Sequence, residues 1–288
     1  MSSTHSFRGL VVPMVSPFTK DGRIDEAAVE RIVNHLVAGG VHGIFPLGTT
    51  GEAASIHPQE KQKLVSGAVR AAGKRATVYA GIASNCLQES IEAARIYAEI
   101  GANAFVAHPP CYYPLTDQQI EPYFSKLADQ VPRPLVLYNI PATAHQSISL
   151  DAIGRLRKHP NIVAIKDSAA DPARITELLR VCGGRDGFPV LLGNSSQFTH
   201  GLKHGGVGLV PSGGHLAPEL YRAMFDAAMA NRWADVERLQ TQTDIICARY
   251  LKGRTLGQGL AALKVILEER GLCGRTMLPP LTDHIGNL

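Results

Sequence analysis

Short apolar runs alternate with longer amphipathic segments along most of this 288-residue chain, and this alternation limits the possible folds more than any other feature. The runs are four to seven residues long, which is too short for a helix. They also lack the alternation of apolar and polar residues typical of a strand with one exposed face, so they predict strands buried on both faces. The eight expected strands are Gly9–Val15, Gly43–Leu47, Thr77–Gly81, Ala104–His108, Leu135–Asn139, Ile162–Lys166, Val190–Gly193 and Gly208–Pro211.

The segments between these runs have the spacing of amphipathic helices. In Leu87–Ile100, for example, Ile91, Ala94 and Ala98 fall on one face of a helix, and glutamates fall on the other. The same pattern predicts seven further helices, at Asp25–Ala38, Pro58–Ala72, Asp117–Asp129, Leu150–Lys158, Pro172–Arg180, Ser196–His204 and Pro218 to about Ala230.

Eight strand–helix units predict an α/β protein with a (β/α)8 TIM barrel. A doubly wound open sheet is the alternative, but it would more often carry a Gly-x-Gly-x-x-Gly turn after its first strand. Here that turn is Ser16–Thr19, with the sequence Ser-Pro-Phe-Thr. Residues 231–270 show helical patterns and no further strand pattern. We therefore expect a barrel with the active site over residues 1–230, and a small C-terminal helical region over residues 231–288.

Composition argues against several classes of partner. The chain has 29 basic and 25 acidic residues, a net charge of +4, and no block of like charge, so nucleic acid and membrane surfaces gain little support. Five scattered cysteines without a Cys-x-x-Cys pair favour reduced thiols over a disulfide framework or zinc site. The start of the chain lacks a signal-peptide pattern, and no run approaches the roughly 18 apolar residues of a membrane span. A cytoplasmic protein is expected.

Lys166 is the residue that most strongly suggests a chemistry. Catalytic groups of barrel enzymes sit at the carboxyl ends of strands, and Lys166 ends the sixth expected strand. Burial disfavours the charged form of an amine, and a neutral amine can attack a ketone to form an iminium, which acts as an electron sink. A lysine that merely leads out of its strand is the alternative, and position alone does not separate the two.

Tyr138 strengthens the catalytic interpretation of Lys166. It is near the end of the preceding strand, so both side chains can reach one cavity. A buried phenol can shuttle the protons needed to form an imine and to break a carbon–carbon bond. A core aromatic residue with a satisfied hydroxyl is the commoner explanation for a tyrosine taken alone. Together the two residues favour a Schiff-base lyase over a non-catalytic barrel that binds a keto acid.

Four short motifs occur in a defined order along nearly the whole chain. They are Gly48–Glu52 (Gly-Thr-Thr-Gly-Glu), Tyr112–Tyr113, Tyr138–Pro141 (Tyr-Asn-Ile-Pro) and Lys166–Ser168 (Lys-Asp-Ser). The first is a turn whose N–H groups and hydroxyls suit a carboxylate, although such a turn can also simply cap a helix. Together the motifs resemble the dihydrodipicolinate synthase / N-acetylneuraminate lyase family of class I aldolases. The resemblance implies a barrel lyase without a metal or other cofactor, typically a homotetramer built as a dimer of dimers.

The resemblance also implies roles for individual residues. Lys166 corresponds to the Schiff-base lysine and Tyr138 to the proton shuttle. Thr49 and Thr50 correspond to ligands of the pyruvate carboxylate, and Thr50 also to a member of the proton relay. Tyr113 corresponds to the residue that completes this relay from a neighbouring subunit. The backbones of two more residues are implied to line the pocket, namely Gly193 and Val210.

Thr143 is a departure from the family pattern. Dihydrodipicolinate synthases usually place an arginine five residues after the strand-five tyrosine, where it holds the carboxylate of the second substrate. A threonine cannot make that bidentate ion pair, so Thr143 favours a substrate with a hydroxyl at this point. Ser195 and Ser196 stand where sialic-acid lyases tend to carry acidic residues, which argues against that branch. His200 and His204 have a metal-ligand spacing, but no third ligand is evident and no metal is expected.

These observations predict a Schiff-base lyase, an aldolase or dehydratase, that acts on a pyruvate-derived 2-keto acid. A 2-keto-3-deoxy sugar acid and 4-hydroxy-2-oxoglutarate are both compatible with the residues. Two alternatives stay open. One is 4-hydroxy-tetrahydrodipicolinate synthase, which joins pyruvate to aspartate semialdehyde, and the other is a barrel that binds a keto acid without turnover.

Overall fold

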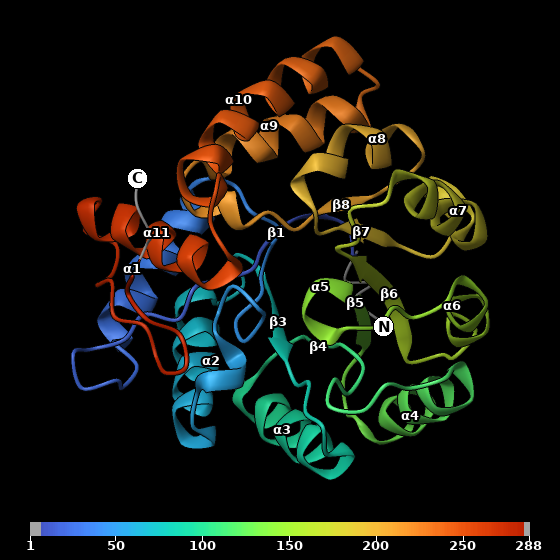
Figure 1. Ribbon diagram of the computed structural model, residues 1–288, viewed down its shortest axis with the longest axis horizontal. Helices are drawn as coiled ribbons and strands as arrows, with labels where there is room; N and C mark the ends of the chain where they lie inside the picture. The colour runs from blue at the N-terminus through green and yellow to red at the C-terminus, as the bar shows by residue number, and fades with distance from the viewer. Residues whose placement is uncertain (1–6, 285–288) are drawn as a thin grey trace. The chain divides into compact units, whose positions relative to one another are not determined.

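A computed structural model describes residues 7–284, and its eight strands are hydrogen-bonded in parallel, in chain order, as a closed barrel (Figure 1). The predicted (β/α)8 fold is therefore confirmed. All strand residues are buried except Thr77 and Val163, which explains why the runs show no polar alternation. The strands are β1 Gly9–Val12, β2 Gly43–Ile44, β3 Thr77–Gly81, β4 Ala104–Ala107, β5 Leu135–Asn139, β6 Ile162–Asp167, β7 Val190–Leu192 and β8 Gly208–Leu209.

Prolines shorten three strands relative to the expected ranges. Pro13, Pro46 and Pro211 fall inside the expected first, second and eighth strands, and each observed strand ends before its proline. Proline has no N–H group, so the ladder of backbone hydrogen bonds cannot continue through it. Beyond Pro13 the Met14 N–H still donates to the Phe45 carbonyl oxygen (2.9 Å), outside the assigned strands.

Eight helices follow the strands as expected, and side chains fix several of their first turns. The Asp25 carboxylate accepts the Ala28 N–H (3.0 Å), and the Ser149 hydroxyl accepts the Ala152 N–H (3.0 Å). The expected helix Ser196–His204 instead begins with a 3-10 turn before its α-helical part. The helices are α1 Glu26–Ala38, α2 Pro58–Ala72, α3 Leu87–Ile100, α4 Asp117–Gln130, α6 Leu150–Leu156, α7 Pro172–Cys182, α8 Phe198–Lys203 and α9 Pro218–Met229.

The described chain groups into two compact units. The first comprises Tyr79–Val210 with the chain up to Leu10, and the second comprises Val11–Val78 with the chain from Pro211 onward. The second unit contains the expected C-terminal helices, α10 (Trp233–Leu251) and α11 (Leu256–Glu269). No strand occurs between residues 210 and 284. The proposed division of the chain at residue 230 stays a prediction.

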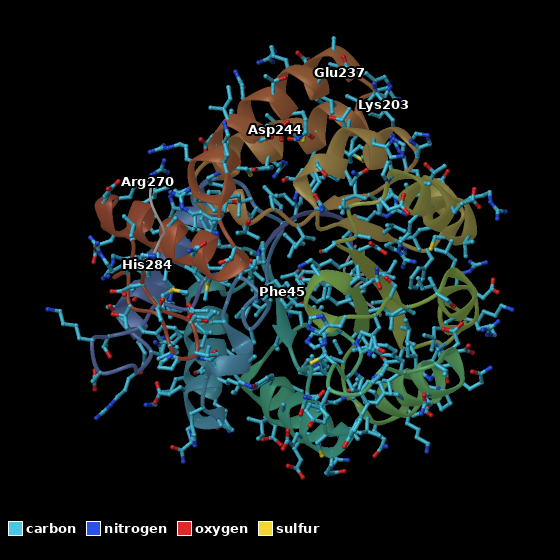
Figure 2. All side chains as sticks on the ribbon, in the orientation of Figure 1. Phe45, Lys203, Glu237, Asp244, Arg270 and His284 are labelled. Carbon is cyan, nitrogen blue, oxygen red and sulfur yellow. The ribbon has the colours of Figure 1, made fainter. Side chains whose placement is uncertain are left out.

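Helix α10 separates a buried face from a polar one. Its buried residues recur at helical spacing, whereas Glu237 and Asp244, both labelled in Figure 2, are exposed. No helix in residues 7–284 combines the length and the apolar character that a bilayer crossing requires. The buried residues of α10 are Val236, Leu239, Thr243, Cys247 and Tyr250.

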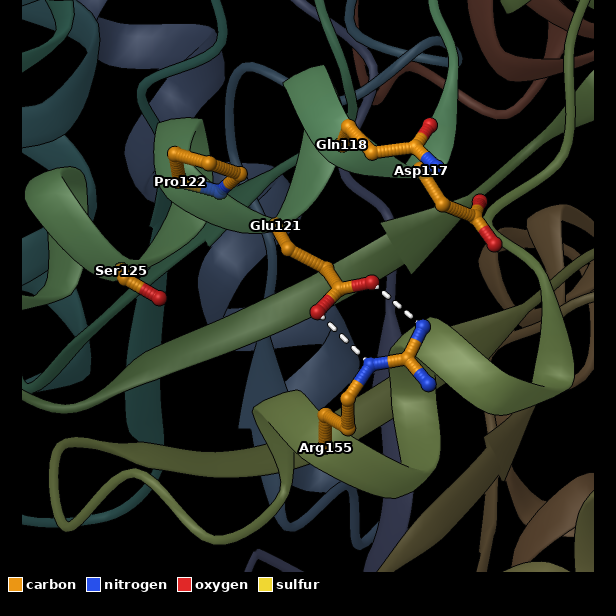
Figure 3. Close-up of a pocket in the computed structure, with 6 residues that line it drawn as sticks. All are labelled: Asp117, Gln118, Glu121, Pro122, Ser125 and Arg155. Carbon is orange, nitrogen blue, oxygen red and sulfur yellow. Dashed lines mark hydrogen bonds and ion pairs between the residues drawn. The ribbon is translucent and has the colours of Figure 1, made fainter.

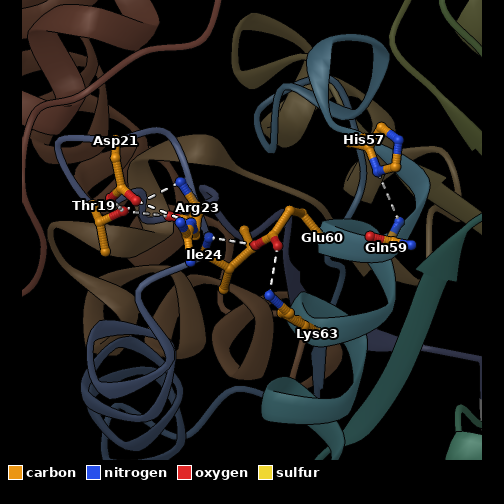
Figure 4. Close-up of polar contacts among 8 residues, drawn as sticks. All are labelled: Thr19, Asp21, Arg23, Ile24, His57, Gln59, Glu60 and Lys63. Carbon is orange, nitrogen blue, oxygen red and sulfur yellow. Dashed lines mark hydrogen bonds and ion pairs between the residues drawn. The ribbon is translucent and has the colours of Figure 1, made fainter.

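Polar contacts join the segment before α1 to helix α2 (Figure 4). The Glu60 carboxylate on α2 accepts the Ile24 N–H (2.8 Å) and a hydrogen bond from Lys63 (2.6 Å). The turn before Ile24 is closed by Thr19, whose N–H donates to the Arg23 carbonyl oxygen (2.8 Å). These bonds hold the chain leaving β1 in a defined path within the second unit.

Candidate active site

Strands β5 and β6 bring the predicted lysine and tyrosine together. The two strands pair in parallel with Tyr138 opposite Lys166, so both side chains lie on the same face of the sheet. The Lys166 Nζ lies 3.9 Å from the centroid of the Tyr138 ring. Only 5% of Lys166 and 4% of Tyr138 is exposed. The carboxyl ends of two neighbouring strands thus hold a buried amine against a buried phenol.

The next residue on each strand belongs to a buried polar network. Asp167 is opposite Asn139, and its carboxylate accepts hydrogen bonds from the Asn139 amide (2.9 Å) and the Arg174 guanidinium (3.0 Å). The Asn139 side-chain oxygen accepts the Ile148 N–H (2.9 Å), and Arg174 donates to the Ile148 carbonyl oxygen (2.9 Å). Because successive residues of a strand point to opposite faces, this network braces the strand ends from behind the lysine and tyrosine.

The same network encloses the segment that carries Thr143. This residue lies in α5 (Pro141–Ala144), a short helix that the sequence pattern did not predict, and it is partly exposed. The segment leaves the network at Asn139 and rejoins it at Ile148. Arg174 was not expected to have a role, because its contribution depends on how α7 packs behind β6.

Gly193 follows β7 and approaches the lysine closely. A Cβ atom added to Gly193 would lie 2.1 Å from the Ser168 Oγ and 2.9 Å from the Lys166 Cε, so a side chain there would displace one of them. The Gly193 N–H donates to the Asp167 carbonyl oxygen (2.7 Å). Val210, which follows β8, is buried, and its N–H donates to the carbonyl oxygen of Leu192 (2.8 Å).

Tyr113 is on the exposed segment that follows β4. Tyr112 and Tyr113 are 76% and 68% exposed, and their rings pack edge to face with centroids 4.9 Å apart. The segment that carries them is fixed at its base, since the Asn85 side-chain oxygen accepts the N–H groups of Cys111 (2.8 Å) and Tyr112 (3.1 Å). The two rings are therefore presented outward from an anchored segment.

The second unit contains the turn Gly48–Glu52. Thr49 and Thr50 are partly exposed in it, and Glu52 adopts the left-handed conformation with a φ of 54°. A Cβ atom on Gly51 would lie 2.8 Å from the Met14 carbonyl oxygen, so the backbones approach too closely for a side chain. The turn is thus shaped by a glycine and by one left-handed residue.

Glu52 itself turns inward to a buried ion pair with Lys264 of α11, which the sequence did not predict. The Lys264 Nζ also donates to the Thr276 carbonyl oxygen (2.8 Å), and the Glu52 carboxylate accepts the Leu278 N–H (3.2 Å). Burial raises the pKa of Glu52 and lowers the pKa of Lys264, and in each case the opposite charge counteracts this effect. The only sequence signal was a charged residue within the apolar pattern of the helix.

Other polar features lie on the outer helices. A hollow on α4 and α6 is lined entirely by helix residues, with an ion pair between Glu121 and Arg155 (2.8 Å; Figure 3). The His200 Nε2 lies 2.9 Å from the Thr176 hydroxyl, and His204 contacts the carbonyl oxygen of His200. Within residues 7–284, no group of three or more His, Cys, Asp or Glu side chains could hold a metal ion.

A (β/α)8 barrel with a buried lysine against a tyrosine at adjacent strand ends defines the class of this protein, an enzyme of the class I aldolase and lyase type. Its sequence matches the model of the Dihydrodipicolinate synthetase family over residues 6–285, and the chain belongs to this family. The predicted family, fold and enzyme class are therefore confirmed.

Individual relatives match over most of their length. The chain is 33% identical over 276 residues to the 4-hydroxy-tetrahydrodipicolinate synthase of Phenylobacterium zucineum, covering 96% of this chain and 92% of that protein. It is 36% identical over 218 residues to the protein of the same name from Acidiphilium cryptum, covering 76% and 74%. The structure of dihydrodipicolinate synthase from Bacteroides thetaiotaomicron is similar with a TM-score of 0.90 and 29% identity, covering 96% and 93%.

Proposed function

We propose that this enzyme is a Schiff-base lyase that cleaves or dehydrates a pyruvate-derived 2-keto acid, with Lys166 as the nucleophile. The observation that carries the proposal is the buried Lys166 Nζ, 3.9 Å from the centroid of the Tyr138 ring. An amine removed from water and placed beside a phenol has the two groups that imine chemistry needs, a nucleophile and a proton carrier.

The chemistry follows from these two groups. The neutral Lys166 amine attacks the C2 carbonyl, and the carbinolamine loses water to give an iminium. As the C4 hydroxyl loses its proton, the electrons of the C3–C4 bond move into the iminium, which releases an aldehyde and leaves an enamine. Protonation at C3 and hydrolysis then release pyruvate and the free lysine. Tyr138 carries the protons of these steps.

Further residues are proposed from the family resemblance. Thr49 and Thr50 bind the substrate carboxylate, with Thr50 in the proton relay, while Gly193 and Val210 line the pocket with their backbones. The absence of a side chain on Gly193 supports its role, because it leaves space beside the Lys166 Cε. Tyr113 completes the relay from a neighbouring subunit of a homotetramer built as a dimer of dimers, and its 68% exposure suits contact with another subunit.

The substrate is proposed to be a hydroxylated keto acid such as a 2-keto-3-deoxy sugar acid or 4-hydroxy-2-oxoglutarate. Thr143 favours the sugar acid of these two, because a threonine hydroxyl can bond a substrate hydroxyl but cannot form a bidentate ion pair with the distal carboxylate of 4-hydroxy-2-oxoglutarate. The second candidate is 4-hydroxy-tetrahydrodipicolinate synthase, which the names of the relatives favour.

Borohydride trapping tests the nucleophile directly. Incubation with pyruvate and borohydride, followed by digestion and mass spectrometry, is expected to place the adduct on Lys166. The Lys166→Arg variant is the control and should carry no adduct. An adduct on another lysine, or none on the wild-type enzyme, would refute the assignment. Tyr138→Phe should retain the fold and lose about 10²–10⁴-fold in turnover, because it removes the proton carrier.

Activity measurements separate the candidate reactions. Pyruvate release from 2-keto-3-deoxygluconate and from 4-hydroxy-2-oxoglutarate is compared with condensation of pyruvate and aspartate semialdehyde. Faster cleavage than condensation supports the first proposal, and faster condensation supports the second. Trapping on Lys166 without turnover of any substrate would indicate a barrel that binds a keto acid without catalysis.

A further inference from the structure

His108 lies beside the candidate catalytic pair. Strands β4 and β5 pair with Ala107 opposite Leu137, so His108, one residue further along, is level with Tyr138. Side chains at equivalent positions of neighbouring parallel strands point to the same face. Because Tyr138 in turn pairs with Lys166, the histidine, tyrosine and lysine form one row across three adjacent strand ends.

Ring contacts agree with this register. The His108 and Tyr138 rings meet edge to face, with centroids 6.3 Å apart and an angle of 67° between their planes. The amine of Lys166 lies over the same tyrosine ring. His108 is therefore close to the reacting groups, with Tyr138 between it and the lysine.

The hydrogen bonding of His108 determines which of its ring nitrogens can accept a hydrogen bond. The Nδ1 atom lies 2.7 Å from the Pro109 carbonyl oxygen, and because a carbonyl can only accept, Nδ1 carries the proton. Burial lowers the pKa of His108 below its ordinary value, and the bond to Pro109 only partly opposes this, so the neutral ring prevails near pH 7. In a neutral ring with a protonated Nδ1, Nε2 is an acceptor. Across residues 7–284 no group hydrogen-bonds to Nε2.

We propose that His108 determines substrate specificity, with Nε2 accepting a hydrogen bond from a substrate hydroxyl at C4 or beyond. The proposal rests on the Schiff-base function and narrows its substrate class to hydroxylated 2-keto acids. A hydroxyl has a hydrogen to donate to Nε2, whereas a carboxylate has none and would place negative charge against the lone pair. His108 therefore favours a sugar-acid type of substrate over a semialdehyde that ends in a carboxylate.

Two substitutions of His108 test the hydrogen-bond acceptor and the aromatic ring separately. His108→Phe keeps an aromatic ring against Tyr138 but has no acceptor, and His108→Gln keeps an acceptor oxygen on a chain of similar reach. Cleavage of 2-keto-3-deoxygluconate is followed by pyruvate release, and trapping of Lys166 by pyruvate and borohydride is measured in parallel. Pyruvate has no C4 hydroxyl, so trapping reports the lysine without the proposed contact.

We expect His108→Phe to lower kcat/KM for the hydroxylated substrate about 10- to 100-fold, and His108→Gln to stay within about fivefold of wild type. Both variants should trap pyruvate at close to the wild-type rate. Unchanged cleavage by His108→Phe, or equal losses of kcat/KM in both variants, would overturn the role of His108 and leave the Schiff-base function standing. Absence of trapping in the wild-type enzyme would overturn the Schiff-base function and this inference with it. If His108→Phe misfolds by circular dichroism, His108→Leu supplies the variant without an acceptor.

Discussion

The buried ion pair between Glu52 and Lys264 predicts a large, non-additive effect on stability. The side chains are 0% and 1% exposed, so removal of either partner leaves a desolvated charge. Such removal typically costs about 3–5 kcal/mol. In Glu52→Gln, Lys264 keeps its hydrogen bond to the Thr276 carbonyl oxygen and its position over the Phe18 ring (4.3 Å). We therefore expect the free energy of unfolding to fall by about 3 kcal/mol. In Lys264→Met, Glu52 keeps only the weaker Leu278 N–H contact, so we expect about 4 kcal/mol.

The double variant Glu52→Gln with Lys264→Met contains neither charge. Its loss of unfolding free energy should be smaller than the sum of the single losses by about 2 kcal/mol or more. Urea unfolding at pH 7.5, followed by circular dichroism, measures all four proteins. Arg180→Met is the matched control, because Arg180 pairs with Glu177 in solvent and should cost under about 0.5 kcal/mol. Additive losses, or single losses below about 1 kcal/mol, would show that the buried pair is not coupled.

Two further predictions concern the site and the response to pH. Gly193→Ala places a Cβ against the Lys166 Cε and Ser168 Oγ, so we expect borohydride trapping at least about tenfold slower with circular dichroism unchanged; a normal trapping rate would show that the lysine moves aside freely. His215 donates its Nδ1–H to the Ser212 carbonyl oxygen and accepts the Val15 N–H at Nε2, and burial lowers its pKa to about 4. In the unfolded chain this histidine has a pKa near 6.5, so below about that pH the unfolded state binds more protons than the folded state. His215 therefore lowers the free energy of unfolding by nothing above about pH 6.5 and by about 3 kcal/mol at pH 4. The difference in unfolding free energy between pH 7 and pH 5 should shrink by about 2 kcal/mol in His215→Asn, and an unchanged difference would contradict the buried neutral state.

The strands could be predicted because burial on both faces leaves a direct trace in composition. The apolar run Ile162–Ile165 followed by Lys166 predicts a buried strand, and the observed β6 covers the same residues and extends one residue further, to Asp167. Strand ends were less well predicted, since the apolar pattern continues through Pro13 and Pro46 whereas the hydrogen-bond ladder does not. The short helix Pro141–Ala144 has too few residues to show a periodic pattern.

A site residue could be predicted where its contacts follow from the order of the strands along the chain. Lys166 and Tyr138 could be paired because consecutive strands of a barrel are adjacent. The position of His108 beside Tyr138 depends on the register of β4 against β5, and the apolar pattern of the sequence does not specify this register. The pairing of Glu52 with Lys264 depends on contacts between distant parts of the chain, and these have no periodic signature in the sequence.

The polar network behind Lys166 and Tyr138 has a consequence for the segment that carries Thr143. Asn139 and Ile148 are joined to each other and, through Arg174, to Asp167, so the eight residues between them begin and end at fixed points. Thr143 lies within that stretch. The stretch can therefore be grafted as a cassette from another family member, with the lysine and tyrosine left in register. We expect such an exchange to preserve the fold provided that Asn139, Asp167 and Arg174 are kept.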